Sequence, residues 1–201
     1  MSQEINLYKD RSNPSWNFEV DQLHTFAFWK NFLSKEECEQ IILLAKSFGL
    51  KKGKTVDKYS KTRKSDICWL YPSDDLQFLF RRITDVALNL NERFFQFDLF
   101  GLNEGLQFSN YTAPSGSFGK HIDRAYGLPV RKLSISIQLT NPDEYEGGEL
   151  KIYDGSEEGT VASKEQGTLI IFPSYVLHEV SPVTKGERNS LVTWITGKNF
   201  K

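Results

Sequence analysis

The second half of this sequence consists of short extended runs separated by turn residues, and this pattern limits the fold more than any other feature. From residue 97 onward, Gly, Pro, Asn and Asp divide the chain into short stretches rich in β-branched and aromatic residues. Strands are expected near residues 106–112, 118–123, 132–140, 149–153, 160–163, 168–172, 177–181 and 189–196. Many short strands with turns between them are typical of an antiparallel sandwich or barrel, of which the jelly roll is one version.

The first half has helical periodicity. Ser34 and Glu37 have the spacing of a capping box, in which each side chain satisfies a free backbone amide of the first helical turn. Gly49 is the expected end of this helix, and its apolar positions recur at helical spacing: Cys38, Ile41, Ile42, Ala45 and Phe48. A second amphipathic helix is expected to begin at residues 72–75 and to end near residues 94–95, with these apolar positions: Leu76, Leu79, Ile83, Val86 and Leu90.

We expect one domain of the α+β class, mainly β, in which helices that precede the strands buttress one sheet. Residues 1–20 are polar and are expected to be a loosely ordered terminus. Residues 21–96 form the supporting part, with strands at 24–29 and 67–70 beside the two helices. Residues 97–197 form the core, and the Gly147-Gly148 pair is expected to be a tight turn between two of its strands.

Composition argues against several classes of protein. The net charge of −1 and the pI of about 6.3 provide no overall basic field for nucleic acid or for an anionic membrane. No apolar run approaches the roughly 20 residues that span a bilayer, and the first ten residues are polar, without the apolar segment of a secretion signal. The two cysteines do not suggest a disulfide scaffold and fit a reducing compartment. A cytoplasmic protein is expected.

One segment departs from this neutral average. Residues 51–66 carry seven basic and two acidic residues, and we favour a solvated, flexible loop. The alternative is a mobile flap that helps to hold an acidic or polar substrate.

Two histidines and one carboxylate form the first candidate for chemistry. Residues two apart in an extended chain point to the same side, so that His121 and Asp123 can reach one ion. His178 would join them from another strand. Two imidazoles and one carboxylate with open positions suit the facial triad of non-haem Fe(II) oxygen chemistry. The plainer alternatives are a surface turn for His121 and Asp123, and a hydrogen-bonded structural histidine for His178.

The second candidate is Arg188, ten residues after His178. It opens an apolar run after residues 184–187, which read as a turn between two strands. A charge inside a buried strand is costly unless it is paired, and the sequence shows no obvious carboxylate partner beside Arg188. A bound dicarboxylate would supply that partner, because a planar guanidinium can bind it through two hydrogen bonds.

These stretches together resemble a known family. The matching segments are residues 106–111, 121–123, 131–140 and 145–150, and the closing strand pair of residues 167–194, in which Trp194 also matches. Over residues 22–197 the chain is similar to the Fe(II)- and 2-oxoglutarate-dependent oxygenases, most closely the bacterial and phage members that are similar to prolyl 4-hydroxylases.

The resemblance implies a double-stranded β-helix, a cupin-like jelly roll, in which His121, Asp123 and His178 are the iron ligands. It also implies that Arg188 holds the distal carboxylate of 2-oxoglutarate. Tyr111 resembles a tyrosine whose hydroxyl helps to hold that carboxylate; the alternative is a core aromatic residue whose hydroxyl bonds a backbone carbonyl. Ser190 shares the Arg188 face by strand alternation and is a weaker candidate, and Trp194 lies on the same face.

The activity implied is hydroxylation of a substrate C–H bond, with O2 consumed, succinate and CO2 released, and ascorbate as a further candidate cofactor. A carboxylate at position 123 favours hydroxylation over halogenation, because no metal position is vacated for a halide. Phe118 stands where the family has Tyr, and Arg188 where collagen-type enzymes have Lys, so prolyl specificity does not follow from the resemblance. Candidate lids over the site are residues 51–66, 112–120 and 124–130.

Several substrates and one other class stay open. The leading hypothesis is a prolyl or other residue in a protein or peptide, and the alternative is a free amino acid or another small metabolite. A nucleic-acid demethylase is less favoured by the neutral charge. A cupin-like metal-binding module without turnover would keep the histidines but would not require Arg188.

Overall fold

The computed structural model describes residues 24–53, 63–124 and 129–199. The predicted loose terminus, residues 54–62 of the predicted flap and residues 125–128 of a predicted lid lie outside these ranges. In the part of the chain that the structure describes, no helix is long and apolar enough to cross a membrane.

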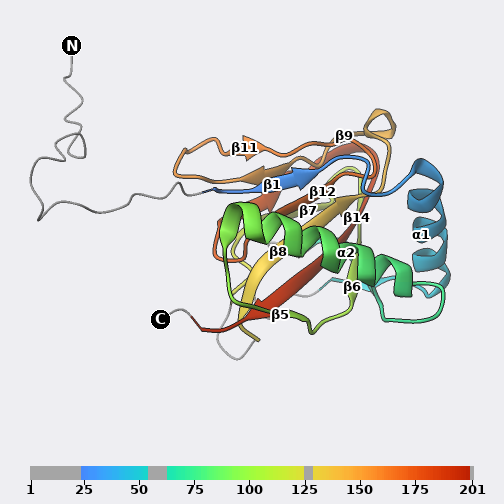
Figure 1. Cartoon of the computed structure of the whole chain (residues 1–201). Coiled ribbons are helices and arrows are strands. Elements are labelled where there is room, and N and C mark those ends of the chain that lie inside the picture. Colours follow the sequence, from blue (N-terminus) through green and yellow to red (C-terminus); the bar gives the residue numbers. More distant parts are fainter. Residues whose placement is uncertain (1–23, 54–62, 125–128, 200–201) are drawn as a thin grey trace, which may run out of the picture.

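Two antiparallel sheets make up most of the described chain (Figure 1). The larger, which we call the major sheet, has the strand order β1-β12-β8-β14-β6-β4-β2, with β5 and β9 also paired to β14. The minor sheet has the order β11-β10-β13-β7-β3. From β6 to β8 and again from β11 to β14, consecutive strands alternate between the sheets, as in the jelly roll that the strand spacing and the resemblance predicted.

All of the expected core strands are present, with small shifts of their ends. They are β6 (Leu106–Thr112), β7 (Ser117–His121), β8 (Arg131–Gln138), β10 (Leu150–Ile152), β11 (Thr160–Val161), β12 (Leu169–Pro173), β13 (His178–Val180) and β14 (Val183–Gly197). Residues 117–120 of one predicted lid therefore belong to β7, which leaves only the short turn before it. Gly147 and Gly148 have the positive φ angles of the tight turn that was expected.

The sequence predicted that the strands before and after residues 184–187 pair with each other, and this prediction is wrong. Residues 184–187 are part of β14, which begins at Val183 and pairs there with β9 (Tyr145–Gly147). Residues 184–187 are typical of a turn, but a register shift and the positive φ of Gly186 allow them to continue the strand. β13 and β14 lie in different sheets and do not pair with each other.

Further short strands were not expected. They are β2 (Lys51–Lys52), β3 (Arg63–Lys64), β5 (Leu99–Leu102) and β9, while β1 (Ala27–Trp29) and β4 (Asp66–Leu70) match the two predicted early strands. The two ends of the 51–66 segment are therefore strands rather than loop, β2 in the major sheet and β3 in the minor sheet. Both are two residues long, too short for a period-2 pattern to show in the sequence.

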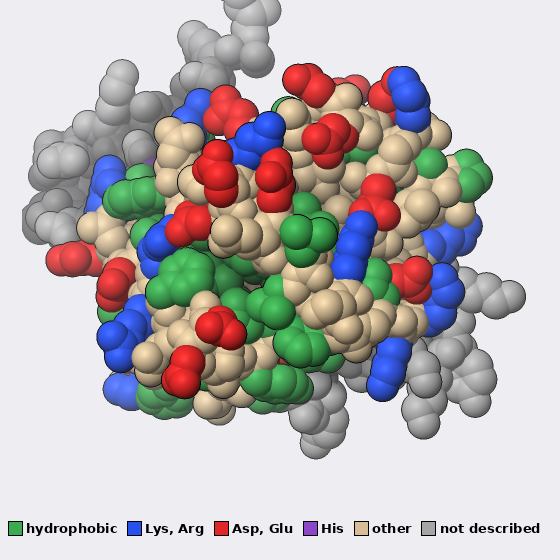
Figure 2. All heavy atoms as spheres, turned by 90° about the vertical axis from the view of Figure 1, so that its right-hand side faces the viewer, with side chains coloured by type: hydrophobic (Ala, Val, Ile, Leu, Met, Phe, Trp, Pro, Cys, Tyr) green, Lys and Arg blue, Asp and Glu red, His purple; other side chains and the backbone are tan. Residues whose placement is uncertain are grey.

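The first helix confirms its prediction closely. Helix α1 (Lys35–Ser47) begins with the capping box, in which Ser34 accepts from the Glu37 amide and the Glu37 side chain accepts from the Ser34 amide. Phe48 was wrongly placed in the core: it is the C-cap residue and is 62% exposed. Figure 2 shows the side of the molecule that carries α1, where hydrophobic side chains reach the surface among charged ones.

The second helix, α2 (Gln77–Leu90), begins later than predicted and has no side-chain cap. It continues into a π-helical turn (η2, Asn91–Phe95), and Gln96 ends that turn with a positive φ of 54°. The predicted apolar positions of α2 are all buried. Figure 1 shows α2 lying across β8, β14 and β6 of the major sheet.

The hydrophobic core lies between the helices and the major sheet. Alternate residues of the central strands face the helices and are at most 3% exposed: Leu106, Phe108, Leu133, Ile135, Ile137, Leu191 and Ile195. They pack with the buried faces of α1 and α2. The opposite, inter-sheet face of the major sheet is turned toward the minor sheet, where a second, smaller cluster contains Ile170, Phe172 and Val180.

Candidate metal centre

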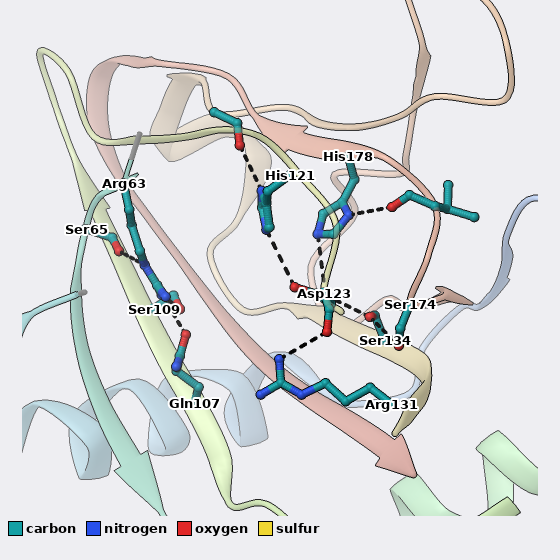
Figure 3. Close-up of polar contacts among 12 residues, drawn as sticks. Arg63, Ser65, Gln107, Ser109, His121, Asp123, Arg131, Ser134, Ser174 and His178 are labelled. Atoms are coloured by element: carbon teal, nitrogen blue, oxygen red, sulfur yellow. Dashed lines mark hydrogen bonds and ion pairs between the residues drawn. The ribbon is translucent and has the colours of Figure 1, made fainter. Parts of the chain in front are cut away.

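The three predicted ligands come together at one end of the minor sheet. His121 ends β7, and His178 begins β13 as its register partner, so that their ring centroids are 4.2 Å apart. Asp123 lies two residues beyond β7, not inside a strand as expected, and its amide donates to the Ser174 carbonyl at 3.0 Å. This backbone bond directs the carboxylate to the two imidazoles (Figure 3).

Three acceptor atoms converge here. The Nε2 atoms of His121 and His178 lie 3.6 and 3.5 Å from the Asp123 carboxylate, and one potential ligand atom from each residue lies within 4.8 Å of the others. Each Nδ1 is in hydrogen-bond contact with a backbone carbonyl, Gly119 O at 2.8 Å and Val176 O at 3.0 Å. In a neutral imidazole, an Nδ1–H that donates to a carbonyl leaves the lone pair of Nε2 free to bind a metal.

A salt bridge does not account for this arrangement. Burial and the neighbouring His178 lower the pKa of His121 to about 4, so that this imidazole is neutral near pH 7. Burial alone would raise the pKa of Asp123, but His178, His121 and the Ser134 hydroxyl outweigh it and lower that pKa. A carboxylate thus faces a neutral imidazole lone pair, and a divalent cation would turn this repulsion into attraction.

Packing holds the ligands in place. The Phe118 ring stacks on His121, with centroids 3.6 Å apart, and Phe172 meets the edge of His178 at 4.7 Å. The Ser134 hydroxyl donates to Asp123 Oδ2 at 2.7 Å.

A buried arginine lies behind this carboxylate. Arg131 donates to the Asp123 backbone carbonyl at 3.4 Å and is held by both oxygens of Glu104 at 2.6 and 2.5 Å. Its guanidinium lies 3.6 Å from the Trp194 ring centroid. The indole Nε1 of Trp194 is buried without a hydrogen-bond partner in the described structure, and it lies close enough to Asp123 to help lower its pKa.

Beyond the metal group, the inter-sheet face of the major sheet is unusually polar. Strand register places Ser190 beside both Ser109 and Gln138, and Trp194 beside Ser134. The buried polar residues of this face are Gln107, Ser109, Ser134, Ser136, Gln138, Arg188 and Ser190. Buried polar side chains are costly unless they have partners, so this face is built to hold a polar ligand.

Arg188 is the charged centre of that face. It is 1% exposed, and its guanidinium donates to Gln138 Oε1 at 2.8 Å and to Ser190 Oγ at 3.4 Å. Its Nε has no hydrogen-bond partner, and no carboxylate forms an ion pair with it among the described residues. The predicted burial of Arg188 is therefore observed, and its charge is not neutralised by the described part of the chain.

Two neighbours of Arg188, Tyr145 and Gly148, shape its surroundings. The buried Tyr145 hydroxyl also lacks a hydrogen-bond partner in the described structure, and the Arg188 charge acts on its pKa, which burial raises. Gly148 has a φ of 62°, and a Cβ there would approach Arg188 Cδ and Val183 Cγ2 to 3.0 Å. The Gly147-Gly148 turn is thus needed for the close approach of β9 to Arg188.

The other predicted residues are close to this charge. The Tyr111 ring centroid lies 5.3 Å from Arg188 Cζ, and Tyr111 is 2% exposed. Among the described residues, no hydrogen bond joins its hydroxyl to a backbone carbonyl, which was the alternative reading. Ser190 contacts the guanidinium, as strand alternation predicted.

The donor set fits the two groups that the sequence implied. Two imidazole nitrogens and a carboxylate suit Fe(II), and their convergence within 4.8 Å of one another suits a divalent cation. The unneutralised Arg188, with the unpartnered Tyr145 hydroxyl beside it, suits a carboxylate. Both sites lie between the sheets, as a molecule with a chelating end and a distal carboxylate would require.

Sequence reasoning did not assign Gln138, Tyr145, Ser134 or Arg131 to the site. A signal was present for two of them: in residues 131–140, Ser134, Ser136 and Gln138 alternate with apolar residues on a strand that is buried on both faces. Nothing in the sequence showed that β9 exists, so Tyr145 could not be placed.

Comparison with known proteins agrees with this site. Residues 106–196 match the 2OG-Fe(II) oxygenase superfamily. A PKHD-type hydroxylase of Saccharophagus degradans is 42% identical over 88 residues, which are 39% of this chain and 38% of the relative. One from Aliarcobacter butzleri is 36% identical over 135 residues, 63% of this chain and 58% of the relative. The matches thus span less than two thirds of these relatives.

Solved structures share the fold at low sequence identity. A Pseudomonas putida prolyl-4-hydroxylase has a TM-score of 0.71 and 20% identity, with 88% of this chain and 94% of that one covered. A prolyl hydroxylase in complex with a hypoxia inducible factor peptide fragment, from Trichoplax adhaerens, has a TM-score of 0.73 and 19% identity, covering 86% of this chain and 84% of the other. Residues 106–196, which contain all three acceptor residues and Arg188, match the 2OG-Fe(II) oxygenase superfamily, and the chain is similar in sequence to PKHD-type hydroxylases and in fold to prolyl 4-hydroxylases.

Proposed function

We propose that this chain is a hydroxylase that uses Fe(II), O2 and 2-oxoglutarate, with His121, Asp123 and His178 as metal ligands and Arg188 as the anchor of the co-substrate. One observation carries the proposal: Arg188 is fully buried without a carboxylate partner in the described chain, on the inter-sheet face of a fold that also brings three metal-binding atoms together. A module that only bound metal would have no use for this costly charge.

The chain's own residues divide the work. The carbonyls of Gly119 and Val176 hold the tautomers that direct both Nε2 atoms inward, and the Ser134 hydroxyl fixes one oxygen of Asp123. The Arg188 guanidinium would bind the distal carboxylate of 2-oxoglutarate, with the hydroxyls of Tyr145 and Tyr111 as further donors. When bound, iron and 2-oxoglutarate would supply the oxidising power that transfers one oxygen atom of O2 to the substrate and the other to succinate, with loss of CO2.

The substrate we propose is a prolyl or other residue of a protein or peptide. Support comes from the fold shared with prolyl hydroxylases, one of which was solved with a peptide fragment. A free amino acid is the alternative, and the chemistry at the metal would be the same. We expect ascorbate to sustain turnover, and we place the activity in the cytoplasm because Cys38 and Cys68 are both free.

Succinate formation tests the proposed function. Pure protein is incubated with Fe(II), 2-oxoglutarate, O2 and ascorbate, and succinate is measured with and without peptides that contain proline. We expect slow succinate release without substrate, and loss of it in His178→Ala and Arg188→Met. Control reactions use Lys198→Gln, an exposed surface change. Absence of succinate under all conditions, together with no binding of 2-oxoglutarate, would contradict the proposal.

A further inference from the structure

A second guanidinium, that of Arg63, lies between the two sheets beside the metal group. Arg63 is on β3 of the minor sheet, but its side chain crosses to β6 of the major sheet, where Nη2 donates to Gln107 Oε1 at 2.6 Å and to Ser109 Oγ at 3.2 Å. Its Nε donates to Ser65 Oγ at 2.8 Å. Figure 3 shows this group on the side of His121 away from Arg131.

One aromatic ring separates Arg63 from the metal ligands. The guanidinium carbon lies 4.9 Å from the centroid of Phe118, and the same ring stacks on His121 at 3.6 Å. Only the Phe118 ring therefore separates the charge of Arg63 from the predicted ligand His121. A molecule that approaches the metal from this side could contact Arg63.

The described partners of Arg63 do not compensate its charge. Two other arginines, the buried Arg131 and the partly buried Arg82, are each held by both oxygens of a glutamate. Arg63, by contrast, contacts only neutral oxygens, and among the described residues no carboxylate lies within 4.0 Å of it. Its Nη1 makes no hydrogen bond in that part of the chain, so one donor edge remains open.

The two unneutralised guanidinium groups are neighbours across one strand pair. Ser109, which contacts Arg63, is the register partner of Ser190, which contacts Arg188. In the proposed function, the distal carboxylate of 2-oxoglutarate neutralises Arg188, and its other end chelates the metal. That co-substrate leaves no anionic group for Arg63, and the described residues supply none, so we look for the anion in another molecule in the site.

We propose that Arg63 is a specificity-determining residue that binds a carboxylate of the primary substrate. The inference rests on the proposed function and adds to it a substrate class: molecules that carry a carboxylate near the hydroxylated carbon. A backbone carbonyl could also accept a hydrogen bond, but it would not neutralise the charge. A planar guanidinium with neutral partners and an open edge suits a carboxylate better.

The test uses the paramagnetism of Mn(II) in the metal site and trifluoroacetate as the carboxylate probe. The ¹⁹F relaxation rate of trifluoroacetate is measured with the Mn(II)-loaded protein at saturating 2-oxoglutarate, which occupies Arg188. We expect a relaxation enhancement that saturates with trifluoroacetate in the wild type. Arg63→Gln should weaken this binding by about tenfold or more, and Arg63→Lys less, because Lys keeps the charge but loses the planar fork.

The matched control is Arg81→Gln, an exposed arginine of α2, which should behave as the wild type. Circular dichroism checks that each variant is folded, and Arg63→Lys carries the test if Arg63→Gln is not. The inference is overturned if 2-oxoglutarate abolishes the enhancement in the wild type, or if binding is equal in both Arg63 variants and the wild type. Arg63 would then have only a structural role, joining the two sheets through its hydrogen bonds.

Binding of 2-oxoglutarate is recorded in the same samples. If it binds and no second carboxylate site is found, only the role of Arg63 fails; if it does not bind, the proposed function fails independently. Competition then identifies the source of the carboxylate. Displacement of trifluoroacetate by N-acetylglycine indicates a free or chain-terminal carboxylate, and displacement by N-acetylaspartate amide indicates an acidic side chain. Equal effects of these acids and of neutral N-acetylglycinamide would overturn the inference.

Discussion

The two faces of the major sheet are built from the same strands and have opposite chemistry. On the helix-covered face, Phe108, Ile135 and Leu191 pack into a continuous apolar core. On the inter-sheet face of the same three strands, Ser109, Ser136 and Arg188 are equally buried, at most 6% exposed. Because both faces are buried, burial alone does not explain why only one of them is apolar.

The helix-covered face stabilises the fold, and the inter-sheet face carries the candidate site. Apolar burial on the helix-covered face stabilises the fold by roughly 25 cal/mol for each Å² removed from water. The polar residues of the inter-sheet face contribute little of this, and the Arg188 charge opposes folding. We infer that the helices and the core bear the cost of a face where the Arg188 charge has no carboxylate partner, and the Tyr145 hydroxyl no hydrogen-bond partner, among the described residues.

The largest expected effect on stability comes from a substitution on the helix-covered face. Phe108→Ala should lower the free energy of unfolding by about 3–5 kcal/mol, because it opens a cavity in a fully buried cluster. Ser136→Ala, on the other face, should cost less than about 1 kcal/mol. Urea unfolding of the metal-free proteins measures both, and equal losses would contradict the contrast between the faces.

The next effect belongs to the inter-sheet face. Arg188→Met should weaken 2-oxoglutarate binding by about a thousandfold, roughly 4 kcal/mol, yet change the unfolding free energy of the ligand-free protein by less than about 1 kcal/mol. Calorimetric titration and urea unfolding give the two numbers. Loss of stability with retained binding would show that this arginine is structural.

The pH dependence of stability should report the metal group. Because the pKa of His121 is about 4 in the folded chain and near 6.5 when unfolded, the unfolded state binds more protons below pH 6.5. Its contribution to stability is present above pH 6.5 and is lost as the pH falls toward 4, by about 2 kcal/mol between pH 7 and pH 5. His121→Asn should remove that part of the slope in metal-free protein; an unchanged slope would show that other groups cause it.

The smallest effect lies in the helical layer. Ser34→Ala removes one half of the capping box of α1 and should cost about 1 kcal/mol of stability. The affinity for 2-oxoglutarate should not change, since α1 packs on the face away from the ligands. A loss of affinity would mean that the two faces are coupled.

Much of the fold followed from local patterns. Alternation and turn residues located the core strands, and the Ser34–Glu37 pair located the start of α1, because both depend on neighbours in the sequence. The pairing of β14 did not follow, since residues 184–187 have turn character and become strand only by pairing with β9. Two-residue strands such as β3 carry no periodic signal.

The candidate site shows the same division. His121, Asp123, His178 and Arg188 were singled out because their chemistry is costly or rare in a strand. Arg63 was hidden in a basic segment that resembled a solvated loop, and its place between the sheets depends on the crossing from β3 to β4. Long-range packing, which a sequence does not display, decides such positions.

The central claim is that the inter-sheet face joins a metal to a dicarboxylate. Calorimetric titration of 2-oxoglutarate into the Mn(II)-loaded protein and into the metal-free protein tests it most directly, since Mn(II) occupies such sites without redox turnover. The account predicts one binding site that is at least about tenfold weaker without the metal, because chelation adds to the Arg188 contact. Binding of equal strength with and without the metal, or no binding at all, would contradict it.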